Sequence, residues 1–416
     1  MTAPTERPTD RQEQHVPLLI VGGGIGGLAT ALAVARTGHP VHLIEQAPEF
    51  TEIGAGLQIG ANATRVMRRL GILDAVEHVA VHPERAVMRD ATTGDKLTTL
   101  TLGSTYRHRY GVPYLVMHRS DLLQILLDAC AAEPLITLEN NRTVTDVELA
   151  ADSVKLVCTD GQAYRADVAI GADGLRSRLR RLFADDEPVC SGYVAYRGTM
   201  PIEDVATDVE ANDVVLWIGP RMHLMQYPVR AGALYNQVAV FHSESFDSGH
   251  KEWGTPEELD AMYARTVEPV RLSAASVSRA RHWPLYDREP LDSYVQGRVA
   301  LLGDAAHPML QVLGQGACQA LEDAVCLADQ LTAYPEDVEK ALASYEQARL
   351  PRTTQCQRVA RPWAEIWHLT DPVAISLRNR IFRTRAADDY SDVDWLYAEL
   401  PTWSAATRSP LSGGSS

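Results

Sequence analysis

The chain has 416 residues, of which 45% are apolar, so it is long enough to form two domains around a substantial core. Its 39 basic and 54 acidic side chains give a net charge of -15, which disfavours binding to nucleic acid or to anionic lipid. The uncharged run from Val16 to Ala35 contains closely spaced glycines, which argue against a membrane-spanning helix. We therefore expect a globular protein with no membrane span and no nucleic-acid partner.

Residues 1–15 are polar, mixed in charge and proline-containing, so they are predicted to be a disordered N-terminus and not a signal peptide. The 6 cysteines are scattered, with no CxxC pair and no histidine cluster at metal spacing. This pattern favours reduced thiols in a cytoplasmic protein without a metal site.

The first predicted unit is a β-strand, an α-helix and a second β-strand. VPLLIV, from Val16, reads as a buried strand, and helical spacing follows from Gly27 to Thr37. Gly38 is suited to end that helix, and PVHLIE is the next strand. The order of these segments predicts a βαβ unit.

Three glycines stand at GxGxxG spacing in the turn of this unit. Gly22 would allow the tight turn, Gly24 would let a pyrophosphate approach the backbone, and Gly27 would let helix and strand pack closely. The helix N-terminus would add partial positive charge. Glu45, at the end of the second strand, could accept hydrogen bonds from ribose hydroxyls. The pattern predicts a dinucleotide site.

Two later segments extend this prediction. In YRADVAIGADGLRSRLRRLF, a buried strand leads to a turn at Asp173 and Gly174, and a helix is expected from Leu175 onward. Its arginines could equally form a solvated basic face. In GRVALLGDAAHPMLQVLGQGACQALEDA, a strand ends at Asp304, whose carboxylate would suit ribityl hydroxyls, and a helix begins near Gly316.

Taken together, the segments GGGIGGLATALAVARTG, GADGLRSRLR and GDAAHPMLQVLGQGACQALEDA resemble, in order and separation, the three fingerprints of the single-component FAD-dependent aromatic hydroxylases. The resemblance covers roughly residues 16–375. It implies an α/β fold in which a Rossmann-like FAD-binding domain, made of residues 16–184 and 285–375, is interrupted by a β-rich substrate-binding domain at 185–284. Residues 376–416 would form a C-terminal extension and tail.

The resemblance also implies roles for particular residues. Asp304 would bind the ribityl chain, Asp173 would serve both flavin and nicotinamide cosubstrate, and Arg119 would approach the FAD pyrophosphate. A charge at a helix start beside a Ser120 cap is the alternative reading of Arg119. The cofactor-binding residues implied by the pattern are Gly22, Gly24, Gly27, Glu45, Arg119, Asp173, Gly303, Asp304, Pro308, Gly316 and Ala317.

The middle of the chain is β-rich, and LWIGPRMHLMQYPVR is its most informative strand. Alternation places His223, Met225 and Tyr227 on one face, with about 13 Å between the first and the last. An unperturbed imidazole, with a pKa of about 6.5, could take a proton from a phenol near neutral pH. A lone histidine is more often structural. Arg221 shares this face, but a strand arginine is more often exposed, so no residue is assigned to a substrate carboxylate.

Within the hydroxylase family, the sequence most resembles the 3-hydroxybenzoate 6-hydroxylases, through segments such as EIGAGLQIGANATRVMRRLGILD, SGYVAYRGT and IGPRMHLMQYP. That resemblance reverses the preference for a structural histidine. It implies that His223 and Gln311 activate the phenol and that Tyr227 contacts the substrate. GQGACQALEDA looks more like the corresponding loop of salicylate hydroxylases, so the ring position attacked stays open.

The expected activity is therefore hydroxylation of a small aromatic acid, 3-hydroxybenzoate to 2,5-dihydroxybenzoate, with FAD as cofactor and with NADH or NADPH and O2 as cosubstrates. Alternatives are a decarboxylating salicylate 1-hydroxylase, another hydroxyaromatic or hydroxynicotinate monooxygenase, a flavoprotein oxidase, and a non-catalytic flavin-binding regulator. By resemblance, a homodimer is also expected. The tryptophans Trp363, Trp367, Trp395 and Trp403 could either pack on the FAD domain or form the dimer contact.

Overall fold

The computed structural model describes residues 13–51, 56–205 and 212–399. One end of the molecule is built on an 8-stranded sheet, in which β16, β17, β10, β1, β2 and β7 lie in that order and β9 and β8 continue from β10. The pairs β1–β10, β1–β2, β2–β7 and β10–β17 are parallel. The strands are β1 (Gln14–Val21), β2 (Val41–Ile44), β7 (Ile136–Glu139), β8 (Val144–Leu149), β9 (Val154–Cys158), β10 (Ala163–Gly171), β16 (Val295–Gln296) and β17 (Val299–Leu301).

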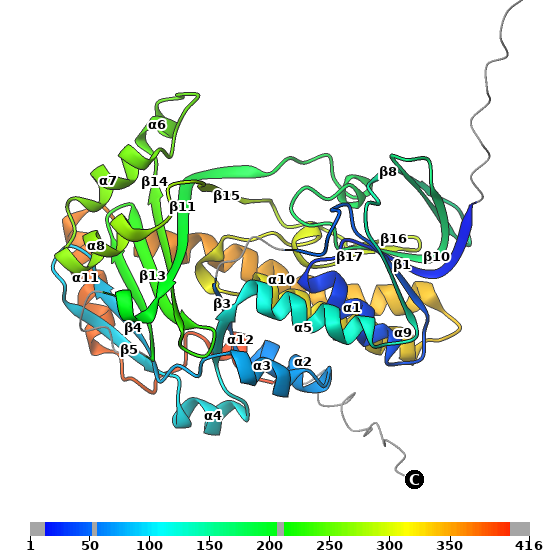
Figure 1. Cartoon of the computed structure of the whole chain (residues 1–416), viewed down its shortest axis with the longest axis horizontal. Coiled ribbons are helices and arrows are strands. Elements are labelled where there is room, and N and C mark those ends of the chain that lie inside the picture. The colour runs from blue at the N-terminus through cyan, green and yellow to red at the C-terminus, as the bar shows by residue number, and fades with distance from the viewer. Residues whose placement is uncertain (1–12, 52–55, 206–211, 400–416) are drawn as a thin grey trace, which may run out of the picture.

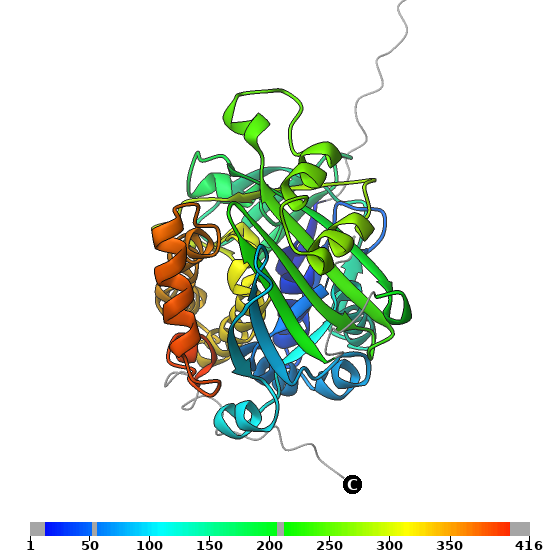
Figure 2. The same ribbon diagram turned by 90° about the vertical axis from the view of Figure 1, so that its left-hand side faces the viewer.

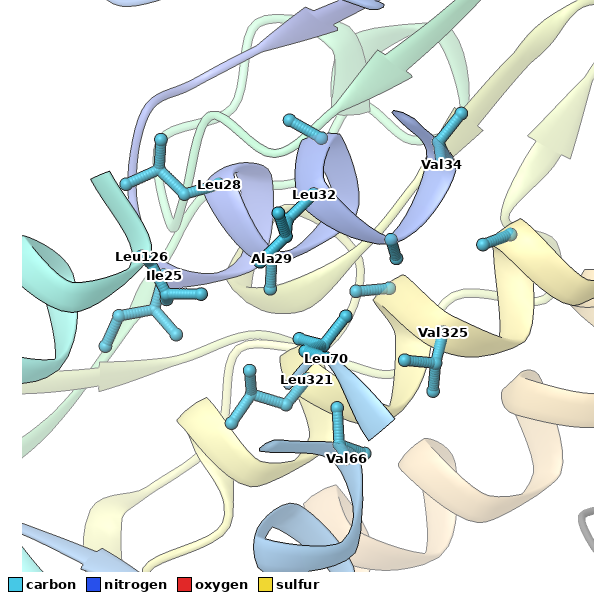
Figure 3. Packing of buried hydrophobic residues seen from close by; sticks show 14 of the residues in the cluster. Ile25, Leu28, Ala29, Leu32, Val34, Val66, Leu70, Leu126, Leu321 and Val325 are labelled. Atoms are coloured by element: carbon cyan, nitrogen blue, oxygen red, sulfur yellow. The ribbon is translucent and has the colours of Figure 1, made fainter. Parts of the chain in front are cut away.

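Helices pack on this sheet around the largest apolar core. Figure 3 shows its centre, to which α1 contributes Ala29 and Leu32 and α9 contributes Leu321 and Val325. Side chains from α2 and α5 close the same cluster. Because these apolar residues recur at helical spacing, each helix presents one face to the core. The helices are α1 (Ile25–Ala35), α2 (Ala61–Arg69), α5 (Arg119–Ala131), α9 (Gly316–Ala333) and the long α10 (Val338–Trp367).

A second, 7-stranded sheet forms the other end of the molecule, in the order β15, β11, β14, β13, β12, β4, β5 (Figure 1). Two helices, α7 (Pro256–Tyr263) and α8 (Glu268–Ser276), pack on its outer face, as Figure 2 shows. This sheet is wider than residues 185–284, because β4 and β5 come from earlier in the chain. Its strands are β4 (Arg85–Asp90), β5 (Lys96–Thr101), β11 (Val189–Pro201), β12 (Asp213–Gly219), β13 (Met222–Val229), β14 (Leu234–His242) and β15 (Trp283–Asp287).

The remaining elements connect the two ends. β3 (Gly56–Ile59) pairs with β6 (Leu115–His118), and α11 (Pro372–Thr384) packs beside β5. Part of the predicted C-terminal extension is therefore packed structure. The other elements are α3 (Leu73–Val79), α4 (Ser104–Tyr110), α6 (Glu244–Asp247), α12 (Asp394–Tyr397) and the 3-10 turns η1 (Leu179–Leu182), η2 (Ile202–Asp204), η3 (Gly303–Ala305) and η4 (Gln311–Leu313).

Two local predictions need correction. The first strand already begins at Gln14, within the segment expected to be disordered; residues 1–12 of that segment lie outside the described residues. The helix expected from Leu175 is only the 3-10 turn Leu179–Leu182. The Asp173 carboxylate causes the difference, since it accepts a hydrogen bond from the Arg178 backbone N–H at 2.7 Å and holds the chain in a tight loop.

Other expectations about the whole chain can also be compared with the structure. All the cysteines are free thiols, and Cys190 alone among them is not fully buried. Across residues 13–51, 56–205 and 212–399, no helix combines the length and apolarity needed to cross a bilayer. Within the same ranges, no group of three or more His, Cys, Asp or Glu side chains is arranged to hold a metal ion.

Candidate functional site

The glycine turn between β1 and α1 adopts the conformation that its spacing predicts. Gly22 has a φ of +112°, and a Cβ there would clash with the carbonyl oxygen of Ala172. A Cβ on Gly27 would clash with the carbonyl oxygen of Gly22, so this glycine permits close packing of helix on strand and does not line the cavity. A Cβ on Gly24 would have no neighbour within 4 Å, which leaves open space beside the backbone at the start of the helix.

Glu45 lies at the end of β2 beside this turn. Its two carboxylate oxygens accept hydrogen bonds from the backbone N–H groups of Gly23, at 2.6 Å, and Ala47, at 2.8 Å. A carboxylate oxygen has two lone pairs, so each of these oxygens can accept a further bond from a ligand hydroxyl. Glu45 lines a cavity of about 620 Å³ that continues along the carboxyl end of the sheet to the second sheet.

Two helix N-termini point into the same cavity. At the starts of α1 and α9, the residues Gly24 and Gln315 make no side-chain capping bond, so the first backbone N–H groups are left for another acceptor. Both residues line the cavity, as do Gly316 and Ala317. Arg119, the first residue of α5, lines it too, whereas Ser120 bonds to His118 and is not the cap. Such a surface fits a negatively charged group.

Asp173 and Asp304 line the cavity from the loops after β10 and β17. Burial raises the pKa of Asp173, although hydrogen bonds from the Ser177 hydroxyl and the Arg178 backbone oppose that rise. Asp304 is exposed, which leaves its carboxylate accessible to the hydroxyls of a ligand.

Asp323 of α9 holds the loop after β17 on the side of the loop that faces away from the cavity. The Asp323 carboxylate accepts a 2.9 Å hydrogen bond from the backbone of Gly303, which lines the cavity, and lies 2.6 Å from His307 Nε2. Pro308 is buried outside the cavity, and its carbonyl accepts a 3.0 Å bond from Gln357. The structure therefore brings the predicted cofactor residues to one cavity, except Pro308 and the packing residue Gly27.

The second sheet forms the opposite wall of the cavity. His223, Met225 and Tyr227 of β13 all line it, which confirms the predicted alternation. Gln311, from η4, lies on the same wall, so the three predicted catalytic residues meet at one cavity.

The pKa of His223 differs from the value expected for a base that acts near neutral pH. Complete burial lowers the pKa of His223 to about 3, instead of leaving it near 6.5. Its Nδ1 lies 2.7 Å from Nε2 of His368, so Nε2 is the ring nitrogen left for a ligand. Without a ligand, the imidazole is therefore neutral throughout the physiological pH range.

Sequence reasoning missed Arg197 of β11. This side chain lines the cavity, donates a 3.0 Å hydrogen bond to Gln311 Oε1 and packs over the ring of Trp283. Its buried Nε has no hydrogen-bond partner among the described residues. The alternation of SGYVAYRGT could have indicated its direction, but the strand order that places β11 near β13 could not be derived from sequence spacing.

Arg221, which the alternation of the strand places on the face of His223, does not line the cavity. This residue lies in the turn before β13 with a φ of +59°, and its guanidinium binds Asp247 at 2.5 Å and His242 at 3.1 Å. Similarly, Arg180 does not belong to a solvated basic face. It is almost fully buried, pairs with Asp186 at 2.9 Å and donates to the backbone of Ala306.

The tryptophans of the C-terminal region divide between several environments. Trp367, at the end of α10, lines the cavity, and its ring meets that of His223 edge-on at 5.4 Å. Trp363 packs in the cluster around Trp367, and Trp395, in α12, packs against the cluster that contains Tyr106 and Tyr397. Trp403 lies outside the described residues.

Comparisons with known proteins agree with this site. The FAD binding domain family matches residues 15–360. A 3-hydroxybenzoate 6-hydroxylase of Klebsiella oxytoca is 36% identical, over 91% of this chain and 96% of that protein. A 3-amino-4-hydroxybenzoate 2-monooxygenase of Streptomyces cremeus is 37% identical, over 92% of this chain and 95% of that one.

A solved structure supports the same assignment. Klebsiella pneumoniae HpxO complexed with FAD and uric acid superposes with a TM-score of 0.78 at 28% identity, covering 90% of this chain and 93% of that one. The α/β fold with an FAD-binding domain and an inserted β-sheet is thus confirmed. The chain belongs to the FAD binding domain family and is an FAD-dependent aromatic monooxygenase.

Proposed function

We propose that the protein hydroxylates 3-hydroxybenzoate at the carbon para to its hydroxyl group, giving 2,5-dihydroxybenzoate, with NADH or NADPH and O2 as cosubstrates. The observation that carries this proposal is the shared cavity. Glu45 and the uncapped starts of α1 and α9 line one end of the cavity. His223, Gln311 and Arg197 line the other end. When bound, FAD would supply the reduction of O2 to an electrophilic oxygen donor.

Arg197 is the group that would hold the substrate carboxylate. Burial lowers the pKa of Arg197, and the nearby Arg119 adds to that effect, so an anion beside the guanidinium would relieve both. Two N–H groups of Arg197 can donate hydrogen bonds to a carboxylate. One is the Nε–H, which has no partner among the described residues, and the other is the N–H that bonds Gln311. This half-buried cation therefore favours an aromatic acid over a neutral phenol.

The positions of Arg197 and His223 suit a ring that carries both groups. Arg197 and Met225 both pair with Val238, and His223 lies two residues along β13 from Met225. Standard sheet spacings then separate the Cα atoms of Arg197 and His223 by about 12 Å. Both side chains line the cavity, which leaves room between them for a benzene ring with a carboxylate at one position and a hydroxyl at another.

His223 would act on the hydroxyl group. Loss of the phenol proton raises electron density at the carbons ortho and para to the oxygen, which makes those carbons better nucleophiles. The Nε2 atom of His223 is the available acceptor, and the proton becomes stable there once the phenolate charge lies beside it. Tyr227 and Met225 would pack against the ring, and these side chains would limit the access of water and the loss of reducing equivalents to peroxide.

Identity to the relatives does not choose among substrates, since two relatives of nearly equal identity are named for different aromatic acids. Salicylate 1-hydroxylation with loss of carbon dioxide and hydroxynicotinate hydroxylation are therefore rival reactions. Two other rivals differ in class: a flavoprotein oxidase would need no NAD(P)H, and a flavin-binding regulator would show no ligand-stimulated oxidation.

We further propose, by family resemblance, that the protein is a cytoplasmic homodimer. Light scattering would test the dimer.

The substrate test uses purified holoprotein with NADH and, separately, NADPH. Their oxidation would be followed with 3-hydroxybenzoate, salicylate, 6-hydroxynicotinate and the uncharged 3-hydroxybenzamide, with products separated and peroxide counted. We expect 3-hydroxybenzoate to give 2,5-dihydroxybenzoate in stoichiometric yield, and the amide to be a poor substrate. Catechol from salicylate as the main coupled product would overturn the substrate assignment.

A further inference from the structure

A second histidine lies directly behind His223. The Nδ1 atom of His223 and the Nε2 atom of His368 are 2.7 Å apart, and the two rings are nearly parallel, at 14°. The residues come from distant parts of the chain, because His368 is the C-terminal cap of α10. The bond requires one shared proton between two nitrogens, so the state of either ring sets the tautomer of the other.

The position of His368 is fixed from several sides. Its backbone N–H donates to Ala364 at 3.1 Å, its carbonyl accepts from the Arg221 N–H at 3.1 Å, and its ring stacks on Tyr193 with 4.6 Å between centroids. A buried ring held this firmly keeps its nitrogen in line with His223. The contact is therefore built into the fold at the end of α10.

The remaining nitrogen of His368 is unusual. Its Nδ1 is buried and has no hydrogen-bond partner among the described residues. When His223 donates its Nδ1 proton, His368 must carry its own proton on this Nδ1, and a buried donor without a partner costs about 1–3 kcal/mol. That tautomer is also the one in which His223 Nε2 is free to accept a proton from the cavity.

Exposure increases from the cavity through this pair to the surface. His223 and His368 are 2% and 6% exposed, and the side chains of His242 and Asp247 are 14% and 46% exposed. The charged and titratable groups around His368 are Tyr193, Arg221, His223, His242 and Arg378, with Asp247 beyond them. Asp247 pairs with Arg221 at 2.5 Å, and burial together with His223, His242 and Arg378 lowers the pKa of His368, so a proton charge does not stay on the pair.

We propose that His368 is a relay and positioning residue that acts through His223 to carry the phenol proton out of the cavity. The phenol O–H bond breaks as a proton binds His223 Nε2. The Nδ1–H of His223 passes to His368 Nε2, and the Nδ1–H of His368 passes to a water molecule at that buried nitrogen, for which the described residues supply no partner. One proton leaves the pair, and both rings remain neutral after the transfer. This inference rests on the proposed function, because it requires a phenolic substrate beside His223.

Two substitutions separate relay from positioning. His368→Gln keeps a side chain able to bond His223 but unable to pass a proton, whereas His368→Phe keeps only the ring that stacks on Tyr193. His108→Gln removes an exposed histidine on α4 and is the control. The probe is 3-hydroxybenzoate bound to the oxidised holoenzyme, and its ionisation is followed by ultraviolet absorbance against pH and by stopped flow.

In both His368 variants we expect unchanged flavin content, a KM close to that of the wild type, and phenolate formation slowed by about 10- to 100-fold. The bound phenol should also ionise at higher pH, and free imidazole should partly restore the rate in His368→Ala. Wild-type ionisation kinetics in His368→Gln would overturn the relay. If the wild type itself fails to ionise 3-hydroxybenzoate, the substrate assignment fails, and the same comparison is then made with the phenol that stimulates NAD(P)H oxidation.

Discussion

At the scale of single residues, burial changes what His223 can do. A histidine whose pKa is about 3 does not act as a base towards solvent near neutral pH. It accepts a proton only when a negative charge forms next to it, as happens when a phenol in the cavity ionises. In the proposed reaction, the same burial that makes His223 a poor base without a ligand would link proton transfer to substrate binding.

Replacement of His223 by alanine should separate substrate binding from hydroxylation. We expect His223→Ala to retain FAD and ligand-stimulated NAD(P)H oxidation, because the cofactor loops lie elsewhere, and to lose about 10²-fold or more in hydroxylation. Reducing equivalents should then appear as hydrogen peroxide. Full product yield per NAD(P)H in this variant would remove His223 from the reaction.

Replacement of Arg197 tests the carboxylate assignment. Arg197→Met should raise the KM for 3-hydroxybenzoate by about 10- to 100-fold and leave the KM for 3-hydroxybenzamide nearly unchanged, because a buried charge-assisted bond is worth about 1.5–3 kcal/mol. Arg221→Met is the matched control, since Arg221 binds Asp247 outside the cavity. Equal effects of Arg197→Met on the acid and the amide would argue for a packing role only.

At the scale of elements, the loop between β17 and α9 is held by hydrogen bonds on its buried side and faces the cavity on its other side. Asp323 fixes this loop through Gly303 and His307, while Asp304 faces the cavity. Asp304→Ala should therefore fold normally but be purified with depleted flavin, measured by the ratio of flavin to protein absorbance. A fully loaded Asp304→Ala protein would count against the proposed contact with the ribityl chain.

The sequence predicts local units well because their signals are local. Gly22, Gly24 and Glu45 lie within a single βαβ unit, and the turn geometry that they require is present. The contacts of Arg197 and His368 depend on which strands are neighbours and on where α10 ends. No residue spacing encodes those long-range facts, and so the guanidinium and the second imidazole became visible only in the fold.

Tertiary contacts also explain two side-chain directions that differ from the sequence pattern. Arg221 follows the alternation of β13 in sequence, but it occupies the turn, where Asp247 binds it. The arginine-rich segment after Asp173 looks amphipathic, yet Arg180 is held in the interior by Asp186 and backbone carbonyls. Asp247 sets the direction of Arg221, and Asp186 together with the Ala305 and Ala306 carbonyls sets that of Arg180.

At the scale of the whole molecule, buried titratable groups link stability to pH. The pKa of His223 falls to about 3 on folding, so the unfolded chain binds more protons below about pH 6.5 and stability decreases as the pH falls. Burial would raise the pKa values of Glu322 and Asp323, but Arg349 and Arg352 lower the first to about 2, and His307 and Arg349 lower the second to about 2. The stability from these carboxylates is present above about pH 4 and is lost as the pH falls towards 2.

Thermal unfolding of the holoprotein between pH 7 and pH 4 tests the histidine contribution. His223 adds at most one proton of linkage, or about 1.4 kcal/mol per pH unit, to the pH dependence of unfolding. His223→Leu should therefore show a shallower fall in Tm over this range, and the control His108→Gln should follow the wild type. Parallel curves for His223→Leu and the wild type would show that burial of His223 carries no such cost.

In the proposed reaction, one cavity joins FAD to a phenolic acid, and one oxygen atom enters the ring para to its hydroxyl group. The most direct test of this reaction is turnover of 3-hydroxybenzoate with NAD(P)H under ¹⁸O₂, with the product identified by mass spectrometry and NMR. We expect 2,5-dihydroxybenzoate carrying one ¹⁸O atom at the new hydroxyl for each NAD(P)H oxidised. Unlabelled product, hydroxylation at another ring position, or peroxide as the only product would contradict it.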